Sequence, residues 1–226
     1  MSLTKHLDAN WPAPQNIRAL STTMAQDIKQ LQTEFDLPGT PEWLNQTHSN
    51  LCIEVDKTTS RDADASVTQS KSRVLAIRTA DCLPIVLCNQ EGSEIAALHA
   101  GWRGLLNGVV ENTVSTMQSP ANTLIAWVGP HICQSCFEVG AEVPEAFIKN
   151  YPFAKAAFTY KNEHKYLGNL QAIATQILKN QGINAIFHAN KCTFEEKETF
   201  FSYRREKQTG RIATLIWFNP TERDTL

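Results

Sequence analysis

The sequence lacks any long apolar run. No stretch approaches the roughly 18 apolar residues of a membrane span, and residues 1–14 lack the apolar segment of a secretory signal peptide. It also lacks an excess of either charge, since 21 Lys and Arg residues stand against 23 Asp and Glu residues. These absences predict a cytoplasmic protein, with neither a membrane nor a nucleic acid as its partner.

Internal repeats and low-complexity tracts are also missing, and the 226 residues are enough for one domain with a full core. We therefore expect a single domain over residues 1–226. Six cysteines are too few for a disulfide scaffold in a chain of this size. In a reducing compartment they are expected to be thiols or metal ligands.

Short apolar runs bounded by polar or glycine-containing segments predict strands. They cover residues 74–77, 83–88, 94–99, 124–128, 183–187 and 212–218. Helical spacing predicts one helix within residues 105–117, a second within 170–178 that stops at Gly182, and a third within 24–31. The pattern is typical of the α+β class, an α/β sandwich in which helices pack on a mixed sheet.

Two of these runs, residues 83–88 and 94–99, flank a polar turn and form a predicted hairpin. If Cys88 lies at the turn, His99 lies opposite Cys82 or the residue after it. Side chains facing each other in an antiparallel pair are about 5 Å apart at Cβ. That separation suits two ligands of one metal ion.

A third ligand is available at His48, in a polar segment that is typical of a loop. Imidazole and thiolate together favour zinc or copper over magnesium or calcium. Three protein ligands with an open fourth position are the arrangement of a catalytic zinc site. Taken singly, a surface histidine and a small core cysteine are the simpler interpretations of such residues.

The residues around the hairpin offer further chemistry. Asp81 either shuttles a proton or orients a ligand histidine, and its place beside Cys82 leaves both roles open. Residues 101–104, Gly-Trp-Arg-Gly, lead into the first predicted helix. Its N-terminus and Arg103 would attract phosphate, or the glycines simply allow a tight connection.

A basic cluster spans residues 204–211 and is typical either of a solvated turn or of an anion site. Arg204, Arg205, Arg78 and Arg61 are all candidates for binding phosphate. Elsewhere, the Cys133-x-x-Cys136 spacing, two residues after a histidine, is a weak signal for a second metal or redox site.

Five ordered motifs together resemble the purine nucleoside phosphorylase / polyphenol oxidase family, also called the laccase-domain family. They are Gln46-Thr47-His48, Thr79-Ala80-Asp81-Cys82-Leu83-Pro84, His99-Ala100-Gly101-Trp102-Arg103-Gly104, Phe137-Glu138-Val139-Gly140 and Phe200-Phe201-Ser202-Tyr203-Arg204-Arg205. The match runs from about Trp11 to Trp217, nearly the whole chain.

The resemblance implies that His48, Cys82 and His99 are zinc ligands, with copper as the alternative metal. The family's activities would be phosphorolysis of adenosine, inosine and methylthioadenosine, and deamination of adenosine. Asp81 and Cys82 would then be catalytic. Nucleoside and phosphate would be bound by residues within or near the motifs, namely Gln46, Arg78, Arg103, Arg204 and Arg205.

Two other activities are associated with the family: editing of peptidoglycan precursors as a hydrolase and oxidation of polyphenols with copper. The six histidines are too few for a multicopper centre. The chain also departs from the family after Thr23, where a Gly-rich loop is replaced by residues 24–31. This shortening predicts an intact metal site beside a substrate pocket that lacks part of its wall and is wider and more exposed.

Overall fold

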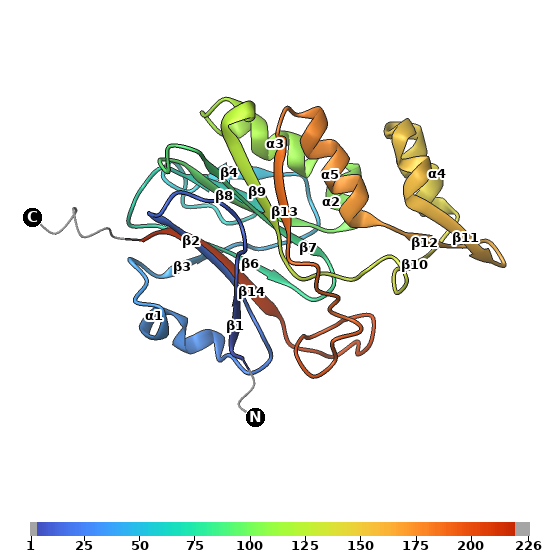
Figure 1. The fold of residues 1–226 in the computed structure, drawn as a ribbon, viewed down its shortest axis with the longest axis horizontal. Helices are drawn as coiled ribbons and strands as arrows, with labels where there is room; N and C mark the ends of the chain where they lie inside the picture. The colour runs from blue at the N-terminus through green and yellow to red at the C-terminus, as the bar shows by residue number, and fades with distance from the viewer. Residues whose placement is uncertain (1–3, 220–226) are drawn as a thin grey trace, which may run out of the picture.

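The computed structural model describes residues 4–219 and builds its core from two β-sheets packed face to face (Figure 1). The first sheet has five strands in the order β1-β2-β14-β6-β3. They are β1 (His6–Asp8), β2 (Ile17–Thr22), β3 (Pro41–Trp43), β6 (Val74–Thr79) and β14 (Ile212–Phe218).

The second sheet has six strands in the order β13-β9-β7-β8-β5-β4. They are β4 (Cys52–Glu54), β5 (Ala65–Thr68), β7 (Leu83–Asn89), β8 (Ile95–Ala100), β9 (Leu124–Val128) and β13 (Ala185–His188). Its pairs are antiparallel except for β4 with β5 and β13 with β9. The two sheets together confirm the α+β sandwich.

Continuous apolar strands serve both faces of the second sheet because side chains alternate along a strand. In β7, Leu83, Ile85 and Leu87 face the helices, whereas Val86 and Cys88 face the first sheet. Every residue of β7 is buried. This explains why its sequence is an apolar run without polar alternation.

Helices cover the outer faces of both sheets. On the six-stranded sheet lie α2 (Trp102–Leu106), α3 (Val109–Thr116) and α5 (Leu170–Asn180). The five-stranded sheet is covered by the 3₁₀ turn η1 (Ile28–Gln30) and the single turn α1 (Leu31–Glu34). Within residues 4–219, no helix is long and apolar enough to cross a membrane.

A small third sheet and one helix project from the side of the molecule (Figure 1). This sheet consists of β10 (Glu138–Gly140), β12 (Lys165–Gly168) and β11 (Phe158–Asn162). The helix α4 (Glu142–Asn150) follows β10, and the 3₁₀ segment η3 (Pro152–Ala157) leads into β11. Another 3₁₀ turn, η2 (Ala121–Thr123), precedes β9.

Several predicted elements are confirmed, and others need correction. The strands predicted at residues 124–128 and 212–218 match β9 and β14, and α5 ends before Gly182, whose φ is +96°. The helix predicted within residues 105–117 is two helices, because the chain turns at Gly108 with φ +90°. The helix predicted within 24–31 is wrong for its first half, since residues 28–30 form η1 and residue 31 begins α1.

Candidate active site and metal centre

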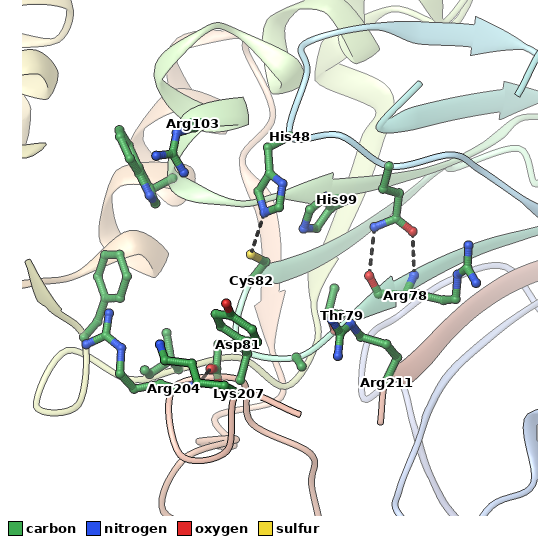
Figure 2. Close-up of a pocket in the computed structure, with 16 residues that line it drawn as sticks. His48, Arg78, Thr79, Asp81, Cys82, His99, Arg103, Arg204, Lys207 and Arg211 are labelled. Atoms are coloured by element: carbon green, nitrogen blue, oxygen red, sulfur yellow. Dashed lines mark hydrogen bonds between the residues drawn. The ribbon is translucent and has the colours of Figure 1, made fainter. Parts of the chain in front are cut away.

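Three segments distant in sequence bring His48, Cys82 and His99 together at one end of the six-stranded sheet (Figure 2). His48 lies in the loop between β3 and β4, Cys82 directly precedes β7, and His99 lies on β8. The Cys82 Sγ atom is 3.7 Å from His48 Nε2, and the two imidazole ring centroids are 4.7 Å apart. One ligand atom from each residue lies within 4.8 Å of the others.

The hairpin register differs from the predicted one. His99 pairs with Pro84, so the prediction that it faces Cys82 or Leu83 is wrong. The turn between the strands is longer than assumed, since Cys88 pairs with Ile95. Cys82 still approaches His99 because it lies two positions from Pro84 and therefore projects to the same side of the strand.

A buried carboxylate, Asp64, connects the ligand segments. Its Oδ1 lies 2.7 Å from His99 Nδ1 and accepts the His48 backbone N–H at 3.0 Å. Its Oδ2 accepts the backbone N–H groups of Thr47 and Ser49 and the Ser49 hydroxyl. By engaging Nδ1 of His99, Asp64 directs Nε2 of this ring toward the other two ligands.

Ionisation in this cluster is set by burial and by close hydrogen bonds acting against each other. For Cys82, burial opposes the thiolate, but hydrogen bonds with His48 and His99 lower the pKa to about 7. For His99, burial opposes the charged ring, while Asp64 and Cys82 raise its pKa to about 9. Burial also opposes ionisation of Asp64, whose pKa is nevertheless lowered to about 2 by His99 and Ser49.

The residues present fit a metal ion. Two imidazoles and a thiolate form a donor set for zinc or copper, and the neighbouring carboxylate supplies the outer hydrogen bond that ligand histidines usually have. The chain also leaves space there, since a Cβ atom on Gly101 would lie 2.7 Å from His48 Cδ2 and 3.0 Å from Cys82 Sγ. Glycine at this position keeps the two ligand side chains free of steric conflict.

Asp81 has a different environment from Cys82 and does not orient a ligand histidine. Its backbone has φ +92°, and its carboxylate accepts the Thr193 hydroxyl at 2.7 Å and the Arg204 backbone N–H at 2.6 Å. Asp81 therefore fixes the segments that follow β13 beside the cavity. The orienting carboxylate is Asp64, which no sequence motif distinguishes from the chain's other acidic residues.

A cavity of about 610 Å³ opens over the three ligands. Its walls carry an excess of positive charge from Arg78, Arg103, Arg204, Lys207 and Arg211, and Figure 2 shows these side chains surrounding Cys82. The volume is within the range of small-molecule sites. Lys207 and Arg211 belong to the basic run, but their separate role in the cavity was not predicted.

Aromatic rings line the same cavity, and several of these cations lie over them. They are Trp102, Phe137 and Tyr203. The guanidinium of Arg103 lies 4.3 Å from the Trp102 ring, and the ammonium of Lys207 lies 4.6 Å from the Tyr203 ring. Flat apolar surfaces next to fixed cations suit a ligand that has both an aromatic and an anionic part.

The remaining predicted binding residues divide into lining and supporting positions. Arg204 lines the cavity, and its guanidinium donates to the carbonyls of Cys136 and Glu138. The structure places Arg205 outside the cavity lining, where it donates to three backbone carbonyls. Arg61 binds Glu42 and is likewise outside the lining.

Gln46 lies at the cavity edge but uses its amide within the protein. Its Nε2 donates to the Arg78 carbonyl and its Oε1 accepts the Arg78 N–H, each at 2.8 Å (Figure 2). The helix whose N-terminus was expected to attract phosphate is also shorter than predicted. The helix that follows Gly101, α2, has only five residues, so few aligned peptide dipoles contribute at its N-terminus.

The fold and the motifs together define the chain as a laccase-domain protein. The family model described as "Multi-copper polyphenol oxidoreductase laccase" matches residues 19–219, and the chain belongs to this family. A crystal structure of a Neisseria meningitidis protein is similar over 96% of this chain and 100% of its own, with 36% identity and a TM-score of 0.91.

Curated relatives cover nearly all of the chain. A Shigella flexneri protein named "Purine nucleoside phosphorylase YfiH" is 39% identical in an alignment of 242 positions. The alignment covers 95% of this chain and 99% of that protein. A Haemophilus influenzae protein named "Purine nucleoside phosphorylase" is 42% identical over 94% of this chain and 98% of its own. The Shigella alignment is longer than the 226 residues of this chain, so that relative has segments that this chain lacks.

Proposed function

We propose that this protein is a metal-dependent purine nucleoside phosphorylase acting on adenosine, inosine and methylthioadenosine, and that the same site deaminates adenosine. The observation that carries the proposal is the meeting, in one cavity, of a His, Cys, His donor set with cations and aromatic rings. The names of the Shigella and Haemophilus relatives support phosphorolysis.

In phosphorolysis, a phosphate oxygen attacks the anomeric carbon of the ribose while the bond to the base nitrogen breaks. The bonding electron pair leaves with the base, which takes up a proton, and the products are the free base and ribose 1-phosphate. Arg103, Lys207 and Arg211 would hold the phosphate dianion and lower its repulsion with the leaving electrons. Phe137 and Trp102 offer the apolar faces on which a purine can stack.

His48, Cys82 and His99 would hold the metal, which we propose to be zinc. When bound with an open position, zinc supplies Lewis-acid polarisation and lowers the pKa of a coordinated water molecule. Asp64 keeps His99 and the His48 loop in place for this role. Asp81 holds Arg204 beside the substrate through the Arg204 backbone N–H.

The metal assignment is tested by Cys82→Ala, which should lose the metal bound by this site together with nucleoside turnover. Cys52→Ala is the matched control, because Cys52 is a half-buried thiol outside the cavity lining. Metal is measured by mass spectrometry and turnover by chromatography of the released bases. An unchanged metal content in Cys82→Ala would contradict the site.

The two reactions should differ in their need for phosphate. Without phosphate, base release from inosine should stop, while conversion of adenosine to inosine should continue, because only phosphorolysis consumes phosphate. The measurement is mass-spectrometric analysis of both nucleosides with and without phosphate. Equal loss of both reactions would contradict this division, and turnover of phenolic substrates alone would favour the copper oxidase.

A further inference from the structure

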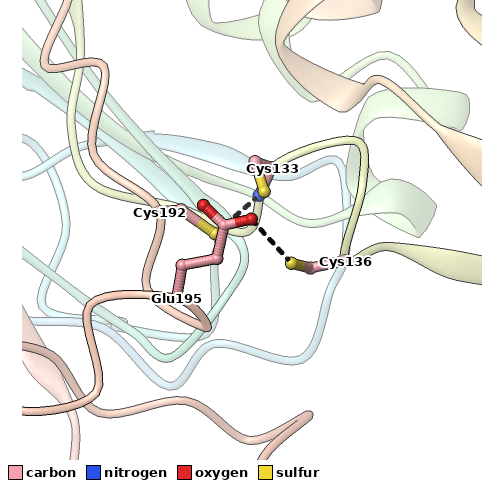
Figure 3. Close-up of side chains that lie close together, drawn as sticks. All are labelled: Cys133, Cys136, Cys192 and Glu195. Carbon is pink, nitrogen blue, oxygen red and sulfur yellow. Dashed lines mark hydrogen bonds between the residues drawn. The ribbon is translucent and has the colours of Figure 1, made fainter.

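A second group of metal-binding side chains lies outside the cavity described above. Cys133, Cys136, Cys192 and Glu195 each place one ligand atom within 4.8 Å of the others (Figure 3). The first two residues belong to the loop after β9, and the other two belong to the loop after β13. The four side chains thus join segments that are about 60 residues apart in the sequence.

Each segment presents its ligands from a tight turn. The Cys136 backbone N–H donates to the Cys133 carbonyl at 3.1 Å, and the Glu196 N–H donates to the Cys192 carbonyl at 3.0 Å. The turns are joined by the Cys133 N–H, which donates to Cys192 Sγ at 3.3 Å. A backbone donor on a ligand sulfur is a common outer interaction of thiolate metal sites.

We propose that Cys133, Cys136, Cys192 and Glu195 bind a structural zinc ion. Zinc in structural sites is tetrahedral, and Zn–S bonds of about 2.3 Å place pairs of ligand sulfurs about 3.8 Å apart. The four ligand atoms lie within 4.8 Å of one another, so only small shifts are needed to reach this geometry. Three thiolates and a carboxylate fill all four positions, so this site has no place for a substrate. The six cysteines of the chain are free thiols in the structure, which leaves all three sulfurs available.

The position of this site gives the bound ion a structural role. Arg205 donates to the carbonyls of Thr193 and Phe194, which lie between the ligands Cys192 and Glu195. On the other segment, the carbonyl of Cys136 itself accepts from Arg204, which lines the active-site cavity. A zinc ion here would clamp the two loops that hold Arg204 in the wall of that cavity.

Metal content tests the proposal directly. Protein expressed with added zinc and purified anaerobically should contain two zinc ions per chain, and Cys192→Ser should contain one. Cys82→Ala should also contain one, and the double variant should contain none. Cys52→Ser is the matched control and should retain both ions, since Cys52 lies in neither group of ligands.

Cobalt reports on the kind of site. Loading Co²⁺ into Cys82→Ala should give the intense visible bands of tetrahedral thiolate coordination, and Cys136→Ser should weaken them. Cys136 is only half-buried, whereas Cys192 is buried, so this variant keeps the test usable if Cys192→Ser does not fold. One zinc per wild-type chain, unchanged by Cys136→Ser, would overturn the proposal, as would a disulfide between these cysteines detected by mass spectrometry of the freshly purified protein.

A kinetic consequence rests on the proposed function. Loss of the second ion should raise KM for the nucleoside several-fold with a smaller change in kcat, because it loosens the wall that holds Arg204. The metal count itself does not depend on nucleoside turnover. A second zinc without any phosphorolysis would refute the proposed function alone, whereas phosphorolysis with a single zinc would refute the second site alone.

Discussion

At the scale of single residues, Asp64 connects the segments that form the candidate metal site. Its carboxylate accepts from three backbone N–H groups and one hydroxyl, and it lies against His99 Nδ1. All of these groups belong to residues 47–49 or to His99. The carboxylate therefore fixes two of the three candidate ligands, His48 and His99, at once.

Replacing Asp64 by Asn should weaken zinc binding by roughly 10- to 100-fold, the usual effect of removing a carboxylate behind a ligand histidine. The amide offers one acceptor oxygen where the carboxylate offers two. Some N–H groups of the loop that carries His48 therefore lose their hydrogen-bond acceptor. Affinity is measured by competition with a chromogenic chelator. Asp62→Asn is the control, because Asp62 is exposed and accepts from Asn45; equal affinities in the two variants would contradict the role of Asp64.

Substitutions of Arg205 and Lys207 should have different effects, the first on stability and the second on substrate binding. Arg205→Ala should lower the free energy of unfolding by about 2 kcal/mol, because the carbonyls of Thr193, Phe194 and Phe200 lose a charged donor. Lys207→Ala should leave stability nearly unchanged and raise KM for phosphate roughly tenfold, about 1.4 kcal/mol of binding. Denaturant titration and steady-state kinetics check both. The opposite pattern would show that Arg205 contacts substrate.

At the scale of elements, the segment after β2 is where the family resemblance predicts that the chain is shortened. The Met24 N–H donates to the Thr199 carbonyl at 2.9 Å, so this segment lies beside the loop that supplies Tyr203, Arg204 and Lys207 to the cavity. Within residues 4–219, the cavity lining includes no residue between Thr23 and Phe35. A longer segment in a relative would add material next to that loop.

We therefore expect normal zinc content but a higher KM for nucleosides than in a relative with the longer segment, since such loops commonly form pocket walls while the sheets position the metal ligands. The measurement compares metal content and steady-state kinetics of this protein with those of the longer relative. Grafting the relative's segment after Thr23 should lower KM. Matching KM values before grafting would show that the segment does not contact substrate.

The elements also show what the sequence could predict. The apolar runs of β9 and β14 are continuous because both faces of each strand are buried, so their bounds are clear from the letters. The short strands β1, β3 and β4 have partly polar sequences, and tertiary pairing decides their structure. The split between α2 and α3 depends on the positive φ of Gly108, a conformation that an isolated glycine does not reveal.

The candidate site divides in the same way. The hairpin and the residue types make His48, Cys82 and His99 candidates, and the family resemblance singles them out. Of the two predicted registers, only the one with His99 opposite Cys82 is wrong by two residues and keeps the side chains on the correct face of the strand. Asp64, Lys207 and Arg211 were not singled out. Their roles depend on long-range packing between loops, which cannot be predicted from spacing along the chain.

At the scale of the whole molecule, acid should destabilise the fold through one buried histidine and one half-buried histidine. His131 belongs to the loop after β9 and lies buried against the loop after β13. Burial lowers its pKa to about 4, and its Nδ1 lies 2.8 Å from the Gly129 carbonyl oxygen. Burial also lowers the pKa of His188. In the unfolded chain these rings take up protons near their ordinary pKa of 6.5, so the unfolded state binds more protons than the folded state.

The free energy of unfolding should therefore fall as the pH is lowered from about 6.5 toward 4, with an upper limit of about 3 kcal/mol from His131. Thermal melts of chelator-treated protein across this range measure the effect without a contribution from metal release. His131→Gln should flatten the slope, because the glutamine does not titrate, whereas the control His164→Gln, at the exposed turn between β11 and β12, should not. Identical slopes in wild type and His131→Gln would show that other groups cause the acid sensitivity.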